Sequence, residues 1–365
     1  MVFPAIPKMR CKRMEDTVKR VLTGLMVLAV LFLPGCGFWM NGERLYITPH
    51  RENLQQGSEE IVAVATYQQM RDALVQKIET GSQNLVVSVS SFDETTADFY
   101  VSTAITHVLQ NTPFGAYAVN DITYEIGMNR GEQVIAMHVT YRHGIGEIMQ
   151  IKTAETEADA VTHITNALKE CNDSLVFYAK AYTDTDVALF VEDYANEHPD
   201  LVMEQPQVRV TVYPNSGQQR IVEVSFTYQN SRADLRKMQE QVENIFTSAE
   251  LYVQQTKVRE TYSRLYSFLM ERNDYTLETS ITPAYSLLHH GVGDCRAFAN
   301  VYAAMCRRAN LDCKVISGTK NGAPWFWNVV RYQGKYYHID LLNGGNFQML
   351  KDADMTGYVW DYSAF

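Results

Sequence analysis

The chain contains 365 residues, which is enough for about two to three domains. Apolar residues make up 46% of it, the share of an ordinary globular protein, and the formal net charge is -10. No basic stretch after the amino-terminal leader could neutralise phosphates, so the composition argues against a nucleic-acid partner.

The amino-terminal leader consists of a basic segment followed by a short apolar run. An apolar run at residues 21–33 is too short to span a membrane comfortably, and it ends in Leu33-Pro34-Gly35-Cys36, which resembles a lipobox. The basic residues before it are Arg10, Lys12, Arg13, Lys19 and Arg20. We therefore predict a signal peptide at residues 1–36, with Cys36 acylated as the mature amino terminus, and a tether at residues 37–60.

This prediction places the protein outside the cytoplasm, lipid-anchored to the bacterial cell membrane. Membrane lipid would be a partner through the acylated Cys36, since two acyl chains hold a protein at a membrane stably. The alternative is an uncleaved amino-terminal anchor in which the cysteine is incidental.

Residues 61–235 contain one pattern twice, a helix, a strand, a helix and two strands. In the first copy, residues 61–152, the predicted elements are 67–78, 85–89, 96–109, 122–126 and 134–141. In the second, residues 153–235, they are 160–168, 174–179, 187–194, 208–213 and 221–228. The matching order, and the Thr-Tyr pair ending each copy, indicate an internal duplication of small α+β modules. Neither copy carries a cluster with chemical function, so we interpret both as spacers or binding platforms.

Residues 236–365 form the last predicted domain. Residues 234–269 have helical periodicity and predict one broken helix or two successive helices. Further on, Gly291-Val292-Gly293-Asp294-Cys295 delivers a cysteine to the start of a long apolar helix, which Asp294 can cap. The unpaired N–H groups of a first helical turn favour a thiolate, so Cys295 is a candidate nucleophile. A small buried core residue is the other interpretation.

Two strand-like runs follow at residues 327–332 and 335–340, joined by Gln333-Gly334, a hairpin signal. Together they carry a histidine and an aspartate. The order Gly293-Asp294-Cys295, Trp327-Asn328 and Tyr337-His338-Ile339-Asp340 resembles the transglutaminase-like superfamily, whose fold is related to papain-like cysteine proteases. The resemblance implies a Cys-His-Asp triad, with Cys295 as nucleophile and Asp340 as the residue that orients the base. The expected fold class is α+β: two repeated α+β modules, then a transglutaminase-like domain.

The sequence departs from the family at the base. The family's catalytic histidine should stand two positions before Trp327, where this chain has Trp325, and an indole cannot accept a proton from a thiol. His338 is a candidate substitute, because it lies two residues before Asp340 and so on the same strand face. His289 and His290, shortly before Cys295, are further candidates. If no histidine serves as the base, Trp325, Trp327 and Asn328 would line a binding cleft. The alternative for the aromatic residues is a plain hydrophobic core.

No cofactor or metal site is expected. The cysteines outside the leader, Cys171, Cys295, Cys306 and Cys313, lack zinc-site spacing, and no phosphate loop or nucleophile-elbow motif occurs. Cys306 and Cys313 flank the turn after the long helix and could pair in an oxidising compartment, which the sequence leaves open.

Three functions remain in view. The first is a non-catalytic domain of the cell envelope that binds peptide, glycan or protein on a degenerate transglutaminase-like fold. The alternative is an active thiol-dependent transamidase or amide hydrolase, similar to a cysteine peptidase, that acts on cell-surface peptides. A structural subunit of the envelope is the third.

Overall fold

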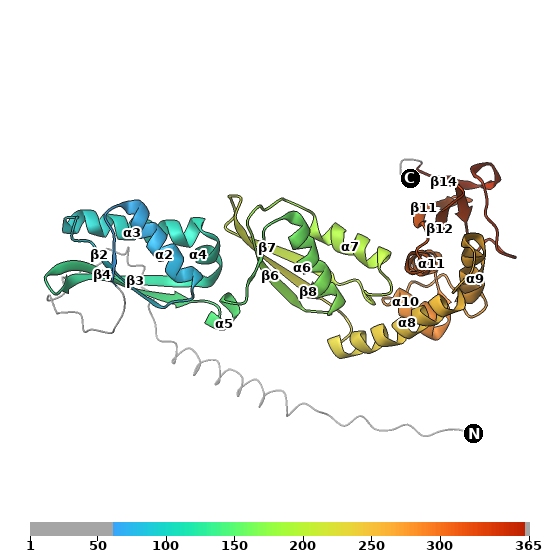
Figure 1. The fold of residues 1–365 in the computed structure, drawn as a ribbon, viewed down its shortest axis with the longest axis horizontal. Helices are drawn as coiled ribbons and strands as arrows, with labels where there is room; N and C mark the ends of the chain where they lie inside the picture. The colour runs from blue at the N-terminus through green and yellow to red at the C-terminus, as the bar shows by residue number, and fades with distance from the viewer. Residues whose placement is uncertain (1–60, 362–365) are drawn as a thin grey trace, which may run out of the picture. The chain divides into compact units, whose positions relative to one another are not determined.

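The computed structural model describes residues 61–361 and confirms the α+β fold class. The predicted signal peptide, Cys36 and the tether lie outside the described residues. Figure 1 shows the elements in chain order, with two helix-and-sheet modules followed by a domain of four main helices and a sheet. In the part of the chain that the structure describes, no helix is both long and apolar enough to cross a membrane.

The first module is a four-stranded sheet of order β1-β2-β4-β3, with α2, α3 and α4 on one face (Figure 1). Met70, Leu74 and Ile78 share one face of α2 and are buried against Leu85 and Val87, which alternate on β2. The elements are β1 (Ile61–Ala63), α2 (Tyr67–Glu79), β2 (Asn84–Ser88), α3 (Glu94–Asn111), α4 (Pro113–Ala118), β3 (Val119–Asn129) and β4 (Glu132–Tyr141).

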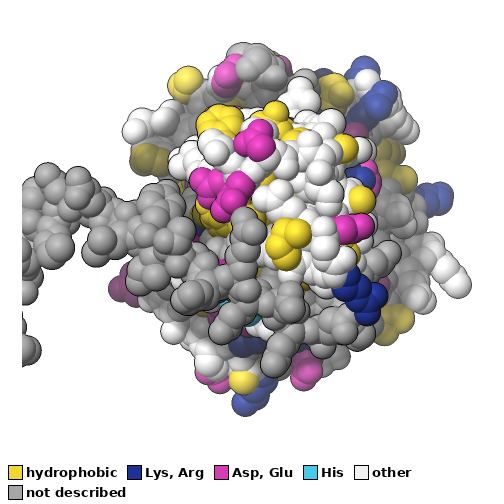
Figure 2. Space-filling view, turned by 90° about the vertical axis from the view of Figure 1, so that its left-hand side faces the viewer, with side chains coloured by type: hydrophobic (Ala, Val, Ile, Leu, Met, Phe, Trp, Pro, Cys, Tyr) yellow, Lys and Arg dark blue, Asp and Glu magenta, His cyan; other side chains and the backbone are white. Residues whose placement is uncertain are grey.

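Figure 2 faces the first module from its side. Acidic side chains gather beside apolar ones on the described part of this face, and Lys and Arg lie toward its edge. The visible surface therefore offers no central basic patch, in keeping with the net negative charge of the sequence.

The second module has the same topology as the first. Its sheet order is β5-β6-β8-β7, and in both modules the first strand pairs parallel with the second while the other pairs are antiparallel. Asp93 caps α3 and Asp186 caps α7, and these two helices follow the second strand of their respective sheets. The common origin of the modules stays a prediction. The elements are α5 (Ile145–Ile148), β5 (Lys152–Ala154), α6 (Glu157–Lys169), β6 (Ser174–Ala179), α7 (Val187–Glu197), β7 (Gln207–Tyr213) and β8 (Arg220–Thr227).

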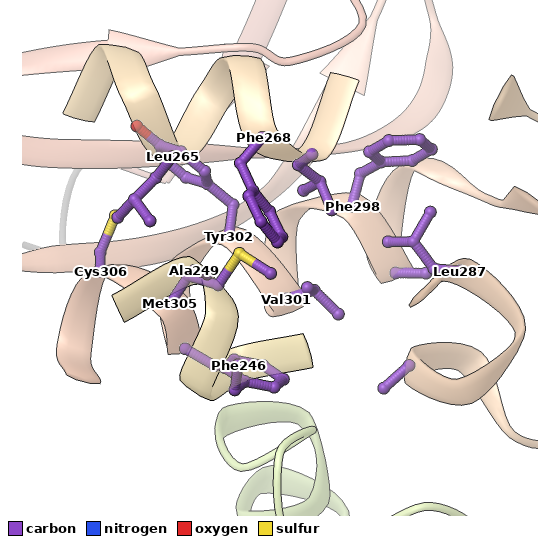
Figure 3. Close-up of a cluster of buried hydrophobic side chains, with 14 of the residues drawn as sticks. Phe246, Ala249, Leu265, Phe268, Leu287, Phe298, Val301, Tyr302, Met305 and Cys306 are labelled. Carbon is purple, nitrogen blue, oxygen red and sulfur yellow. The ribbon is translucent and has the colours of Figure 1, made fainter. Parts of the chain in front are cut away.

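The carboxy-terminal helices pack around one apolar core. Residues 234–269 form two helices, α8 (Arg232–Tyr252) and α9 (Val258–Met270), which the sequence left open as one broken helix or two. Side chains from α8, α9, α10 (Pro283–His290) and α11 (Cys295–Arg308) meet in the cluster of Figure 3, with Phe246 and Phe298 fully buried. Met203 of the second module joins the same core. The second module and the last domain therefore share buried apolar surface.

The last sheet has the order β13-β12-β11-β14 and is antiparallel throughout. Its strands are β11 (Cys313–Lys320), β12 (Ala323–Tyr332), β13 (Lys335–Ile339) and β14 (Tyr358–Trp360). Gln333 and Gly334 have φ of 49° and 74°, which suits the two-residue hairpin that the sequence predicted. β12 begins four residues earlier than expected, at Ala323 instead of Trp327, so Trp325 lies within a strand. A short parallel pair, β9 (Asp274–Tyr275) with β10 (Val292–Gly293), brings Tyr275 beside the turn that precedes Cys295.

Candidate active site

Cys295 is the first residue of α11, where its position is fixed by the cap and by two glycines. Asp294 accepts a hydrogen bond from the Ala297 N–H at 2.8 Å and a second from the Thr279 hydroxyl at 2.8 Å. Gly291 ends α10 in the left-handed conformation, with φ of 77°. Gly293 is buried against Leu287 and Ala297, which would have to move by a few tenths of an ångström to admit a side chain.

Replacement of Gly293 with alanine is expected to lower the free energy of unfolding by about 1–3 kcal/mol, as overpacking of a core does. The added Cβ would lie 3.0 Å from Leu287 Cδ1, 3.2 Å from its Cβ and 3.3 Å from Ala297 Cβ. Urea denaturation measures the change. Gly146→Ala is the control, because an added Cβ there has nothing within 4 Å and the position, like Gly293, does not have a positive φ. Equal losses in the two variants would contradict the packing argument.

The surroundings of Cys295 do not favour a thiolate. Burial raises the pKa of its thiol, and the neighbouring Asp294 carboxylate adds to this rise. The backbone N–H of Phe326 and the first N–H groups of α11 act in the opposite direction but do not offset it. The expected lowering by the helix start therefore does not hold, because the loss of hydration outweighs the helix terminus.

Asp340 lies directly after β13 and is the centre of a dense hydrogen-bond cluster. Its Oδ2 accepts from Trp325 Nε1 at 3.1 Å, Lys320 Nζ at 2.8 Å and the Tyr358 hydroxyl at 2.5 Å, while its Oδ1 accepts from the Leu342 N–H at 2.9 Å. The residue is 8% exposed. A buried carboxylate with one cation and three other donors is well satisfied.

Trp325 stands where the sequence resemblance expects the family's base, and its indole contacts Asp340. A catalytic histidine uses one ring nitrogen to donate to the aspartate and the other to accept the proton of the nucleophile. The indole of Trp325 donates to Asp340 but has no second nitrogen. The indole can therefore make the contact to the aspartate that a catalytic histidine would make, but it cannot accept a proton.

Lys320 and Tyr358 complete the cluster and were not identified from the sequence as site residues. Lys320 Nζ lies 4.9 Å from the Trp325 ring centroid and 5.1 Å from that of Tyr358, within range of cation–π attraction. Burial, and then the hydrogen bond to Asp340, raises the pKa of Tyr358 well above its usual range. Lys320 stands on β11, a strand that no sequence pattern indicated.

Tyr275 is a further residue that sequence reasoning missed. Its ring centroid is 5.8 Å from that of Trp325, and burial, followed by the nearby Cys295, raises the pKa of its hydroxyl. The parallel pairing of β9 with β10 places it there. Tyr275 therefore lies close both to the Cys295 thiol and to Trp325, the hydrogen-bond partner of Asp340.

His338 points into the sheet core. It is 2% exposed, its Nδ1 accepts from Trp327 Nε1 at 2.9 Å, and its Nε2 lies 3.3 Å from Asp352 Oδ1. Burial lowers the pKa of the ring, and Asp352 opposes this only in part. Because both ring nitrogens are engaged, the proton of Cys295 would have to compete with the Trp327 N–H for the acceptor nitrogen.

His338 also predicts a pH dependence of stability. Its folded-state pKa lies below the ordinary value of 6.5, so the unfolded chain binds the proton more tightly. The contribution of His338 is complete above pH 6.5 and is lost as the pH falls below it. We expect the melting temperature of the wild type to fall more between pH 7 and about pH 5 than that of His338→Gln. An equal fall of the melting temperature in the two proteins would contradict the assignment of this pH dependence to His338.

His289 and His290 lie exposed on the last turn of α10. Their rings are 4.7 Å and 5.1 Å from that of Tyr285. Their contacts are thus with their own helix.

Trp327 and Asn328 do not line a cleft, which corrects the expectation from the sequence. Both are 0% exposed. Trp327 packs edge-on against Tyr358 and Trp360 in a small core, and Asn328 Nδ2 donates to the Ala299 carbonyl at 2.9 Å, which fixes β12 to α11. The two side chains point to opposite faces of β12, and both faces are covered here, since residues 327–330 are all buried, whereas Trp325 and Phe326, nearer the end of the strand, stay partly exposed.

A cavity of about 230 Å³ begins at the first turn of α11 and is bounded by the second module. Arg296 connects it to the aromatic residues, because its guanidinium lies 4.9 Å over the Phe326 ring and 3.7 Å from Glu192 of α7. The wall combines apolar side chains with amides and hydroxyls, among them Ile281, Met203, Asn300, Gln205 and Thr279. The space therefore suits a ligand with both apolar and hydrogen-bonding groups.

Comparison with known proteins agrees with the motifs. The family model described as the transglutaminase-like superfamily matches residues 246–341. No curated protein matches the chain.

Among solved structures, a transglutaminase is 12% identical to this chain with a TM-score of 0.28. The match covers 59% of this chain and 64% of the transglutaminase chain. A Cytophaga hutchinsonii protein provisionally named a cysteine protease is 14% identical (TM-score 0.24; 42% of this chain, 70% of its own). A Parabacteroides distasonis protein provisionally named a protease is 9% identical with a TM-score of 0.23, and the match covers 74% of this chain and 45% of that protein. The chain thus spans 64% of the length of that transglutaminase. With the site geometry and the family model together, residues 246–341 are a transglutaminase-like domain.

Proposed function

We propose that this protein is a surface-anchored bacterial lipoprotein whose transglutaminase-like domain binds a ligand in the cell envelope without acting on it. The lipobox at Cys36 supports the anchoring. The site geometry supports the proposed loss of catalytic activity, and one observation carries this inference. Trp325 Nε1 donates to Asp340 at 3.1 Å, so the aspartate that would orient a general base contacts a side chain that cannot accept a proton.

The state of the thiol is a second support. A cysteine nucleophile reacts as the thiolate, and in the related enzymes an adjacent base maintains it. Burial raises the pKa of Cys295, and the surrounding N–H groups do not compensate. Loss of the base typically costs about as much as loss of the whole triad, on the order of a millionfold.

The proposed ligand is a peptide, with a glycan or a protein partner as the other candidates from the sequence. It would occupy the cavity at the first turn of α11 and the partly exposed rings of Trp325 and Phe326. Amide side chains such as Asn300 and Gln205 can pair with a peptide backbone, while Ile281 and Met203 offer apolar contact.

The binding test uses soluble muropeptides from bacterial cell wall, and the same peptides without sugar, in calorimetric titrations of residues 37–365. Ile281→Arg places a charge in the cavity wall from a side chain that is 50% exposed. Leu277→Arg is the matched control, because Leu277 lies four residues away, is 85% exposed and is outside the cavity wall. The proposal predicts binding of both probes that Ile281→Arg abolishes and Leu277→Arg preserves. Binding that neither variant changes, or no binding, would contradict it; binding of the sugar-bearing probe alone would indicate a glycan.

The second candidate is an active thiol-dependent transamidase or amide hydrolase. Cys295 would attack an amide carbonyl, release the amine and leave a thioester, which water or a second amine would resolve. The observation in its favour is that Cys295 and Asp340 keep the family's positions at the start of α11 and after β13. Incorporation of a fluorescent cadaverine into casein tests it: Cys295-dependent turnover would support the enzyme and overturn the binding domain. The third class, a structural envelope subunit, would show neither turnover nor binding.

A further inference from the structure

Cys306 and Cys313 meet at the turn between α11 and β11. The Leu311 N–H donates to the Cys306 carbonyl at 2.9 Å and the Asn310 N–H to the Arg307 carbonyl at 3.0 Å, with Asn310 left-handed at φ of 57°. This closed turn returns the chain alongside the end of α11. The two thiols are in hydrogen-bond contact, with Cys306 fully buried and Cys313 half-buried. Figure 3 shows Cys306 at one side of the helical core, near Leu265.

The other two described cysteines have different surroundings. Cys295 lies beside Phe326 and Asp294 at the opposite end of α11, and Cys171 is buried in the second module near Tyr228. Both thiols of the Cys306–Cys313 pair also lie beside Tyr302, whose hydroxyl donates to the Tyr262 carbonyl at 2.9 Å and which packs in the core. Tyr302 is thus fixed between α11 and α9, and the pair lies against this packed side chain.

We propose that Cys306 and Cys313 form an intramolecular disulfide that ties α11 to the sheet. Disulfides need closely apposed cysteines, and here the two thiols interact across one closed turn, with both side chains packed in the same apolar cluster. α11 begins with Cys295, and β11 ends with Lys320 and pairs with the strand that carries Trp325. The bond would thus join the two elements on which the candidate site is built.

The reaction requires a disulfide oxidant such as oxidised glutathione. Half-buried Cys313 is the accessible thiol; as thiolate it attacks the glutathione disulfide, forms a mixed disulfide and releases one glutathione thiolate. Cys306 then loses its proton and attacks the Cys313 sulfur, which expels the second glutathione. Two thiol protons leave the protein, and its two electrons pass to the oxidant, which ends as two glutathione molecules. A fully buried Cys306 is shielded from the solvent oxidant, so the order of attack follows from exposure.

The experiment uses residues 37–365, which contain four cysteines, first reduced and then incubated with oxidised glutathione. After denaturation without reductant, alkylation should label two thiols instead of four, and peptide mapping should join the peptides of Cys306 and Cys313. The melting temperature should rise by several degrees on oxidation, since a cross-link restricts the unfolded chain.

Cys313→Ser is the control for oxidation elsewhere, because a half-buried position tolerates serine better than the buried Cys306. Its melting temperature should not rise with oxidised glutathione, and its mass should not fall by two hydrogens. Four labelled thiols in the wild type, a stable glutathione adduct on Cys313, or a bond to Cys171 or Cys295 would each overturn the proposal.

Discussion

Replacing Trp325 with histidine is expected to make Cys295 reactive toward activated acyl donors, with a rate roughly 10²–10⁴ times that of the wild type. A histidine at this position can donate to Asp340, as the indole does now at 3.1 Å, and has a second nitrogen to accept the thiol proton. The thiolate would then be stabilised by an imidazolium, which opposes the effect of burial on the thiol. Release of p-nitrophenol from p-nitrophenyl acetate measures the gain.

Two controls isolate the base. Trp325→Phe removes the same indole without adding a nitrogen that can accept a proton, so it should stay at the wild-type rate. Trp325→His combined with Cys295→Ser should lose the gain. An apparent pKa of Cys295 that does not fall in the single variant, or an equal rate for the phenylalanine variant, would show that a histidine at position 325 does not activate the thiol.

Asp340→Ala is expected to lower the free energy of unfolding by about 3–5 kcal/mol, the range for breaking a buried ion pair from one side. The Asp340 side chain is 1% exposed and Lys320 is 19% exposed, with 2.8 Å between Nζ and Oδ2. Removal of the carboxylate leaves this cation and the donors of Trp325 and Tyr358 without their acceptor. Urea denaturation of the two proteins measures the loss.

The double variant Lys320→Met with Asp340→Leu serves as the test of this cause. Replacing both partners by apolar groups of similar volume removes the unpaired charge, so much of the stability should return. If the double variant is as unstable as Asp340→Ala, the loss comes from packing and not from the uncompensated lysine.

Much of the fold could be predicted from the sequence because the periodic patterns are long. The apolar face of α2, with Met70, Leu74 and Ile78, repeats at helical spacing, and the Gln333-Gly334 hairpin has a strong turn signal. The α+β class follows from such elements. The start of β12 was missed because Pro324 usually interrupts a strand, whereas here it lies near the strand end.

The candidate site could be predicted only where it follows the chain. Cys295, Trp325 and Asp340 were singled out from their spacing around family motifs, and the structure brings Trp325 and Asp340 into contact. Lys320 was not, because it reaches Asp340 only through the order of strands in the sheet. Burial was the other limit: alternation along β12 cannot show how deep Trp327 lies, nor that loss of hydration at Cys295 outweighs the helix terminus.

The most direct test of the central claim is the alkylation rate of Cys295 against pH, followed by peptide-resolved mass spectrometry on residues 37–365, with Cys295→Ser to assign the labelled peptide. The account predicts slow labelling at neutral pH and a rate that still rises beyond about pH 8.5, the pKa of a free thiol, because burial raises the pKa of Cys295. Fast labelling at mildly acidic pH, with an apparent pKa well below that of a free thiol, would mean an activated nucleophile and would contradict the account.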